Sequence, residues 1–283
     1  MGNDMNQTLI YDSLFKNLRG GISPLSRAFL YGESIFTTMR VSEGKILFLK
    51  AHLHRLKSGY DWLFDTEDLF PIEKLEKGLI DLASRHSEAR IRVTFFINND
   101  QYEFVPKIER PEFVVMVTDL ESEFLSEVPT VRLGICEEPY TRGIPHFAKV
   151  GSYLYQVRKI KDYRERNFDE ILFLDYNHRL TEASTSNIFF RKDDLFMTPH
   201  LGEGLLGGIM RKNIIRYFKN ANWKIVEGNF DTNRLLESDE VWLTNSSGIK
   251  VVNRVNHKDF SRSKWTDELR KLVLEGIKND QNT

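Results

Sequence analysis

The chain has 283 residues, of which 41% are hydrophobic and 29% are charged, and its formal net charge is -1. These values exclude a disordered, collagen-like or strongly basic nucleic-acid-binding chain, and the length suggests two modest lobes. The single cysteine, Cys136, cannot form an internal disulfide and is typical of the end of a buried strand, which fits a reducing cytosol. No segment resembles a signal peptide or reaches the length of a membrane span, so we expect a cytoplasmic protein with no membrane partner.

The first part of the chain predicts a lobe of mixed helices and strands. Two β-rich runs within residues 35–48 flank the turn signal Ser42-Glu43-Gly44-Lys45, which predicts a hairpin. Apolar residues spaced three to four apart predict a helix over 50–63, and a second helix is expected over 71–84. Residues 89–98 and 112–118 are rich in β-branched and aromatic types and predict strands. We therefore expect an α+β lobe over residues 1–118.

An acidic segment over 119–129 ends in proline and predicts an exposed linker. The second lobe is expected over 130–283, where predicted elements alternate. They are a helix over 152–165, a strand-turn-strand unit over 170–191, a helix over 209–219, a strand over 224–227, a short helix over 232–236, a strand over 240–244 and a final helix over 263–278. No period of 20–50 residues repeats, which excludes a solenoid or propeller.

Two basic residues interrupt this pattern. Arg55 stands beside core leucines in HLHRL, and a solvated arginine whose stem covers apolar surface is the commoner explanation of such a residue. Lys149 follows Phe147 and Ala148 and precedes Val150, so its amine is partly desolvated, which favours the neutral form that reacts with carbonyl groups. A strand-end lysine that reaches water is the alternative.

Three further segments offer groups for a flat, phosphorylated ligand. Glu182 precedes small residues that let the backbone approach a ring, and a carboxylate there can pair with a protonated ring nitrogen. Gly207-Gly208 opens a helix, so the amides of Ile209 and Met210 can face a phosphate. Ser246 and Ser247 follow a strand and supply hydroxyl donors. Ordinary polar turns explain each segment taken alone, but an amine, an arginine, a carboxylate and a phosphate site together match one cofactor, pyridoxal 5′-phosphate (PLP).

The sequence resembles the fold-type IV PLP enzymes, the class IV aminotransferase family. This group includes branched-chain and D-amino acid aminotransferases and 4-amino-4-deoxychorismate lyases. The resemblance runs from about residue 30 to residue 255 and is carried by YGESIFTTMRV (31–41), HLHRL (52–56), TEASTSNIFF (181–190) and MTPHL…GGIMR (197–211). It implies an N-terminal α+β lobe, a larger C-terminal lobe with a β-barrel-like core, PLP in the cleft between them, and a homodimer.

The resemblance also implies roles for individual residues. Lys149 corresponds to the lysine that holds PLP as a Schiff base, Glu182 to the partner of the pyridine nitrogen, and Arg55 to a phosphate ligand. Ile209 and Met210 correspond to donors of backbone amides to the phosphate. Ser246 stands where the family has a phosphate-binding threonine, with Ser247 beside it. We assign no metal ligands.

Within the family, FTTMRV and GGIMRK are more similar to the lyases than to the aminotransferases. The lyases make p-aminobenzoate and pyruvate for folate biosynthesis, and Thr38 corresponds to their threonine near cofactor and substrate. Phe95-Phe96 replaces the carboxylate-binding arginine of D-amino acid aminotransferases, and Leu154 replaces a tyrosine of the branched-chain enzymes. An aminotransferase acting on D-amino or branched-chain amino acids remains the alternative. A non-catalytic protein is disfavoured because Lys149 and Glu182 are both present.

The expected substrate is a small molecule with a primary amine. Its carboxylates would meet basic side chains, for which the candidates are Arg90, Arg92 and Arg142. The cofactor motifs are common to both enzyme classes, so they do not separate the lyase from the aminotransferase.

Overall fold

A computed structural model describes residues 8–18, 20–64, 70–98, 104–105, 111–202 and 204–281. The contacts divide the chain into two units. The first contains Met1–Phe124 and Phe147–Tyr153, and the second contains Leu125–His146 and Leu154–Thr283. The short segment that carries Lys149 therefore belongs to the first unit, although it lies far along the chain from the rest of that unit. The lobe limits expected at residues 118 and 130 stay a prediction.

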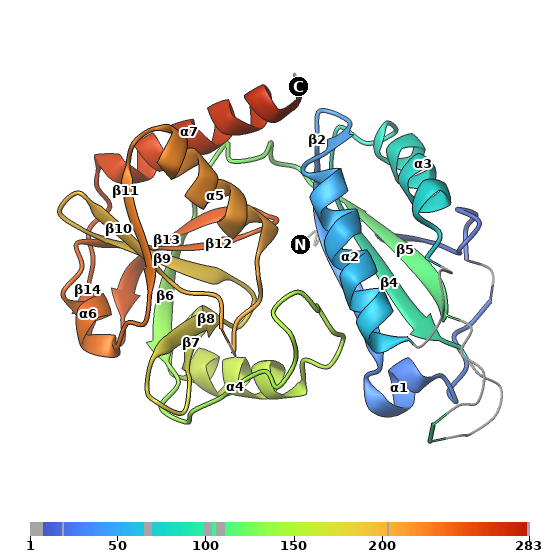
Figure 1. The fold of residues 1–283 in the computed structure, drawn as a ribbon, viewed down its shortest axis with the longest axis horizontal. Coiled ribbons are helices and arrows are strands. Elements are labelled where there is room, and N and C mark those ends of the chain that lie inside the picture. Colours follow the sequence, from blue (N-terminus) through green and yellow to red (C-terminus); the bar gives the residue numbers. More distant parts are fainter. Residues whose placement is uncertain are drawn as a thin grey trace, which may run out of the picture. The chain divides into compact units, whose positions relative to one another are not determined.

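The described residues of the first unit form a five-stranded antiparallel sheet in the order β1-β5-β4-β2-β3 (Figure 1). Three helices accompany it. The strands are β1 (Thr8–Tyr11), β2 (Ser34–Ser42), β3 (Lys45–Ile46), β4 (Glu88–Ile97) and β5 (Pro111–Asp119), and the helices are α1 (Arg27–Tyr31), α2 (Leu49–Leu63) and α3 (Ile72–Ala83). The expected hairpin, the two longer helices and the two strands of this lobe are confirmed.

Alternation along β2 gives the sheet two chemically different faces. Ile35, Met39 and Val41 are fully buried in the core that also contains Leu53 and Leu56 of α2, because side chains two apart on a strand share a face. Phe36, Thr38 and Arg40 belong to the opposite face, where the register places Thr38 beside Arg92 of β4. This second face carries polar side chains beside the aromatic ring of Phe36.

The second unit contains a larger mixed sheet in the order β11-β10-β9-β12-β13-β6-β7-β8, with β14 paired to β13 (Figure 1). Strand β8 lies at one edge of the sheet, whereas β9 lies in the interior of the sheet. Only residues 184–186 connect these two strands, so the sheet must curl to bring them close together. Its elements are β6 (Thr130–Ile135), α4 (Leu154–Glu165), β7 (Glu170–Leu174), β8 (Leu180–Ala183), β9 (Asn187–Lys192), β10 (Leu195–Pro199), α5 (Ile209–Asn220), β11 (Lys224–Gly228), α6 (Thr232–Leu236), β12 (Glu240–Asn245), β13 (Gly248–Val255), β14 (Lys258–Asp259) and α7 (Lys264–Gln281). The α+β class and the barrel-like core are confirmed.

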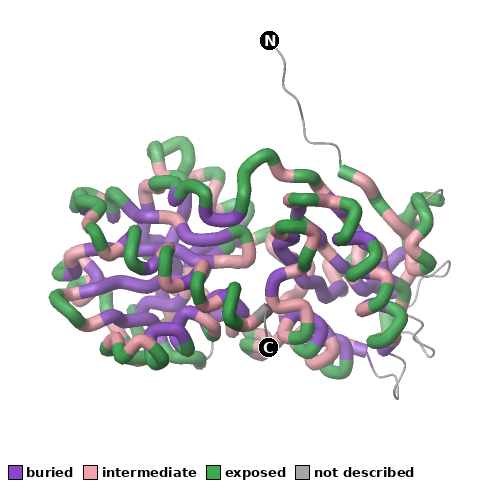
Figure 2. Tube along the Cα trace, turned by 90° about the horizontal axis from the view of Figure 1, so that it is seen from above, coloured by how far each residue is buried: buried purple, intermediate pink, exposed green. Residues whose placement is uncertain are grey.

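Two apolar layers stabilise this sheet, whose strands are largely buried (Figure 2). One layer packs Leu133, Ile188 and Val252 with other, mostly aliphatic, apolar residues. The other is aromatic: Phe196 stacks on Trp223 with 5.1 Å between ring centroids and lies 4.5 Å from the ring of Phe218 on α5. Because large aromatic rings bury much apolar area, this layer fixes α5 firmly against the sheet.

The strand prediction for residues 170–191 was incomplete. The structure has β7, β8 and β9 there instead of one strand-turn-strand unit, and it adds β10 and β13, which were not expected. The small residues of TEASTSN form a tight turn with a hydrogen bond from the Ala183 amide to the Ser186 carbonyl, and this turn divides the run into separate strands. No helix in the described part of the chain is both long and apolar enough to cross a membrane.

Candidate active site

The segment around Lys149 is held on β2 by backbone hydrogen bonds. The Phe36 amide donates to the Lys149 carbonyl at 2.8 Å, the Gly151 amide donates to the Ser34 carbonyl at 2.8 Å, and Ile35 forms a bridge with Val150. A Cβ at Gly151 would lie 2.1 Å from the Ser34 Oγ, so any larger residue here would have to displace the Ser34 hydroxyl. Lys149 is thereby fixed at the end of β2 nearest Ser34.

The amine of Lys149 is half-buried among aromatic groups. Its Nζ donates a hydrogen bond to the Tyr153 hydroxyl at 3.0 Å and lies 4.8 Å from the centroid of the Phe36 ring. The guanidinium of Arg92 stands 3.5 Å from the centroid of the same ring, and burial is the first cause that lowers the pKa of Arg92. Thr38, two residues along β2 from Phe36, is beside Arg92 in register. The first unit thus brings Lys149 and Arg92 to one aromatic ring, with Thr38 beside Arg92 in register.

Arg55 lies on the other side of the same strand. Its Nη2 donates to the Thr37 Oγ1 at 3.0 Å, and that hydroxyl lies 2.7 Å from the His52 Nδ1. Thr37 is 0% exposed and His52 2% exposed. The pKa of His52 is well below its ordinary value, first because of burial and then because of the charges of Arg55 and Lys149. Arg55 therefore contacts a buried polar pair and is not simply a solvated arginine.

In the second unit, Glu182 is the centre of a polar cluster. Its Oε2 accepts a hydrogen bond from the Leu206 amide at 2.7 Å and a longer one from the Asn187 Nδ2 at 3.5 Å. Its Oε1 lies 3.6 Å from the Nε of Arg142, with side-chain exposures of 15% and 5%. The two amide donors on Oε2 and the guanidinium near Oε1 favour the ionised carboxylate.

The start of α5 is built closely against Asn187. The Asn187 Nδ2 donates to the Leu206 carbonyl at 2.8 Å, and a Cβ at Gly208 would lie 1.9 Å from the Asn187 Oδ1. Gly208 is the N-cap residue of α5, and the N-cap position provides no side-chain hydrogen bond to the amides of the first turn. The amides of Ile209 and Met210 thus lie at a positive helix end of the kind that binds phosphate.

The turn at Ser246 and Ser247 is tied to the turn after Glu182. Asn245 donates from its Nδ2 to the Ser186 Oγ at 3.1 Å, while its Oδ1 accepts from the Ser247 amide at 2.8 Å. Thr244 pairs in register with Asn187. Asn187 thus contacts Glu182 and the loop before α5, and Asn245 ties the turn of the two serines to Ser186, the neighbour of Asn187.

Three residues with central contacts were not assigned from the sequence: Thr37, His52 and Asn187. His52 had a usable signal, because it shares the buried stripe of α2 with Leu53 and Leu56. The strand alternation places Thr37 on the core face, which is an unusual position for a polar residue. Asn187 had no such signal, since its importance depends on contacts with a loop about twenty residues later in the chain.

The fold and these groups define the class of protein, and comparison with known families agrees. The model of the family "amino-transferase class IV" matches residues 34–255. The chain belongs to this family and is an enzyme of its PLP-dependent class, as the sequence motifs predict.

Individual relatives come from both branches of the family. The chain is 28% identical to the aminodeoxychorismate lyase of Bacillus subtilis (strain 168), with 91% of this chain and 90% of that protein covered. The branched-chain aminotransferase of Thermoproteus uzoniensis, solved with norvaline, is similar with a TM-score of 0.86 at 19% identity, covering 97% of this chain and 96% of the other. A hypothetical aminotransferase from Mycobacterium tuberculosis, solved in its PLP-bound form, gives a TM-score of 0.82 at 16% identity and covers 97% of this chain and 100% of the other. At these identities the two structures establish the fold alone.

Proposed function

We propose that this enzyme is a 4-amino-4-deoxychorismate lyase that produces p-aminobenzoate and pyruvate. The observation that carries the proposal is the arrangement on the polar face of the first unit, where Arg92 and the Lys149 amine contact the same Phe36 ring and Thr38 is the strand neighbour of Arg92. The nearly full-length similarity to the Bacillus subtilis lyase supports it.

The residues present fit PLP. Lys149 would hold the cofactor covalently, and Arg55 would contact its phosphate. The amides of Ile209 and Met210 would meet that phosphate, and the hydroxyls of Ser246 and Ser247 would add donors. Glu182, which its neighbours favour as a carboxylate, would keep the ring nitrogen protonated. When bound, the cofactor supplies an electron sink for the carbon that loses a proton.

The chain's own residues would then act on the substrate. The Lys149 amine would accept the proton from the substrate ring carbon. The C–O bond to the enolpyruvyl group would break as the ring becomes aromatic, and the departing group would take up a proton to become pyruvate. Arg92 would bind a substrate carboxylate, and Thr38 would orient the ring. No oxidant or second substrate is needed for this balance.

A transaminase must instead bind a free amino acid and retain its amino group for an oxo acid. Phe95 and Phe96 are apolar and buried, so this part of β4 contributes no cationic group to a small amino acid. Loss of such a charge-assisted contact costs on the order of 1.5–3 kcal/mol. We therefore expect poor use of alanine, glutamate and branched-chain amino acids of either hand.

The test supplies chorismate, glutamine and an aminodeoxychorismate synthase to the purified enzyme and measures p-aminobenzoate and pyruvate. A panel of amino acid donors and 2-oxo acid acceptors is assayed in parallel. Equal amounts of the two products support the lyase. Rapid transamination without p-aminobenzoate would assign the chain to the aminotransferase branch instead.

We also propose a cytoplasmic homodimer, as the family resemblance implies. Light scattering on the purified holoenzyme should give twice the 33.2 kDa chain mass. A single-chain mass at assay concentrations would exclude the dimer without affecting the proposed reaction.

A further inference from the structure

A buried hydroxyl links the helix that carries Arg55 to the strand that holds Lys149. Thr37 is on β2, next to Phe36, whose amide bonds the Lys149 carbonyl. The side chain of Thr37 contacts two residues of α2: the Nη2 of Arg55 at 3.0 Å and the Nδ1 of His52 at 2.7 Å. These contacts connect the strand to α2 through side chains within the core.

The direction of the two hydrogen bonds follows from donor chemistry. A guanidinium only donates, so the Thr37 oxygen accepts from Arg55. The hydroxyl has one proton of its own, and we assign the His52 Nδ1 as its acceptor because the described residues offer this proton no other partner. His52 is then neutral with its proton on Nε2, which agrees with the lowering of its pKa by burial and by the charges of Arg55 and Lys149. The donors thus run from Arg55 through Thr37 to His52.

We infer that Thr37 and His52 are positioning residues that hold the Arg55 guanidinium in its phosphate-binding orientation, an inference that rests on the function proposed for Arg55. An arginine side chain has several freely rotating bonds, and a fixed partner at one nitrogen reduces the conformations lost when the anion binds. The other donors of the guanidinium fork keep a defined direction. We assign neither Thr37 nor His52 a contact with the cofactor.

The experiment measures the affinity of the apo form of each variant for PLP by titration. A second titration uses pyridoxal, which lacks the phosphate group. Thr37→Val removes the hydroxyl but keeps the shape, and Thr37→Ser keeps the hydroxyl. Arg55→Ala and the double variant complete a cycle. Thr198→Val is the matched control, because Thr198 is also 0% exposed but bonds the Ile188 carbonyl in the second unit.

We expect Thr37→Val to weaken PLP binding about three- to tenfold, the loss typical of one hydrogen bond, and to change pyridoxal binding little. Thr37→Ser and Thr198→Val should stay within about twofold of the parent. In the Arg55→Ala background, Thr37→Val should add less than about twofold, because coupled residues are not additive. A general loss of stability would instead weaken PLP and pyridoxal alike and would overturn the inference.

The outcomes separate this inference from the proposed function. If Arg55→Ala weakens PLP binding and Thr37→Val does not, the positioning role is wrong while the phosphate role of Arg55 stands. If neither variant has an effect, both are wrong. Nitrogen NMR of imidazole-labelled wild-type enzyme provides a test that needs no variant: a His52 protonated on Nε2 alone is expected, and a proton on Nδ1 would contradict the hydrogen-bond direction.

Discussion

At the residue scale, the site is built from buried polar groups whose partners can be named. Thr38 and Thr37 are adjacent on β2 but have opposite surroundings. Thr37 is 0% exposed and bonded to α2, whereas Thr38 is partly exposed beside Arg92. Adjacent strand residues point to opposite faces, so Thr37 contributes to the scaffold, whereas Thr38 is the one for which we propose a contact with the substrate.

Thr38→Ala tests the second of these roles. Removing one hydrogen-bonding group from the substrate site should lower kcat/KM for p-aminobenzoate formation by about two- to tenfold while PLP stays bound. Thr118→Ala is the control, because Thr118 lies on the same sheet and its hydroxyl bonds only Thr8, at 2.9 Å, among the described residues. Equal kinetics for Thr38→Ala and the parent enzyme would remove Thr38 from the site.

The burial of His52 predicts a pH dependence of stability. Its pKa in the folded enzyme is below its ordinary value, so below about pH 6.5 the unfolded chain binds a proton that the folded chain does not. The free energy of unfolding should therefore fall on acidification, with this group contributing up to about 1.4 kcal/mol per pH unit. The charges that face it, Arg55 and Lys149, act in the same direction.

Urea titrations at several pH values would measure this effect. His52→Asn keeps an acceptor for Thr37 but does not titrate, so its stability should decline less steeply between about pH 6.5 and 5. His54→Asn, at an exposed position of the same helix, provides the control and should keep the slope of the parent. Parallel slopes for His52→Asn and the parent would show that His52 is not held neutral.

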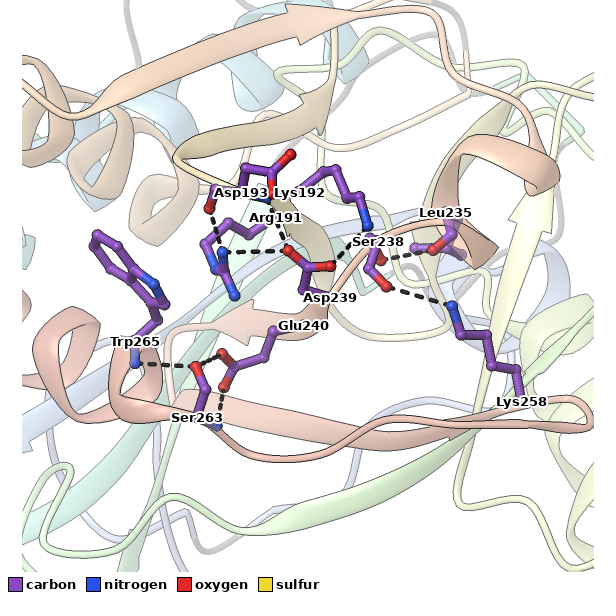
Figure 3. Close-up of polar contacts among 10 residues, drawn as sticks. All are labelled: Arg191, Lys192, Asp193, Leu235, Ser238, Asp239, Glu240, Lys258, Ser263 and Trp265. Carbon is purple, nitrogen blue, oxygen red and sulfur yellow. Dashed lines mark hydrogen bonds and ion pairs between the residues drawn. The ribbon is translucent and has the colours of Figure 1, made fainter.

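At the element scale, the start of α7 is fixed by a buried carboxylate (Figure 3). Glu240, at the first position of β12, is 0% exposed and accepts hydrogen bonds from the amide of Ser263 at 3.2 Å and from the hydroxyls of Ser263 and Thr266. Thr266 in turn accepts from the indole of Trp242 at 2.8 Å. The carboxylate thus joins the sheet to the first turn of the last helix.

Glu240→Gln should destabilise the protein by about 2–3 kcal/mol, because it replaces an acceptor of several hydrogen bonds with a group that is partly a donor. The measurement is the free energy of unfolding in urea. Glu268→Gln, exposed on the same helix, should change it by less than about 0.5 kcal/mol. If both substitutions have the same small effect, the network does not stabilise α7.

The first turn of α5 depends on a glycine because a neighbouring side chain packs closely against it. A methyl group at Gly208 would meet the Oδ1 of Asn187, whose side chain is held by the Leu206 carbonyl. Gly208→Ala should therefore cost about 1–3 kcal/mol of stability and weaken PLP binding together. Gly21→Ala, where no atom lies within 4 Å of the added methyl, is the control. Retention of both properties in Gly208→Ala would show that the start of α5 tolerates displacement of Asn187.

At the scale of the whole molecule, the regular elements with strong periodicity could be predicted and the connections between distant segments could not. Helices α2, α3 and α5 follow apolar spacing in the sequence, and the structure places them within a few residues of the expected limits. Strands β8, β9 and β10 are short and almost continuously buried, so they lack the alternation that would separate them in the sequence.

The same distinction applies to the candidate site. Lys149, Glu182 and the Gly207-Gly208 pair interrupt local patterns and could be selected from the sequence. Their partners could not, because the ion pair of Glu182 with Arg142 joins residues far apart in the chain. Lys149 and Tyr153 are only four residues apart, but their hydrogen bond depends on the backbone pairing of this segment with β2, which the sequence does not reveal.

We propose that the reactive amine of this PLP enzyme is Lys149. The most direct measurement reduces the purified holoenzyme with borohydride, digests it, and locates the phosphopyridoxyl group by mass spectrometry. We predict a single label on Lys149 and none in Lys149→Ala treated in the same way. A label on another lysine, or the absence of any label after incubation with PLP, would show that Lys149 is not the reactive amine.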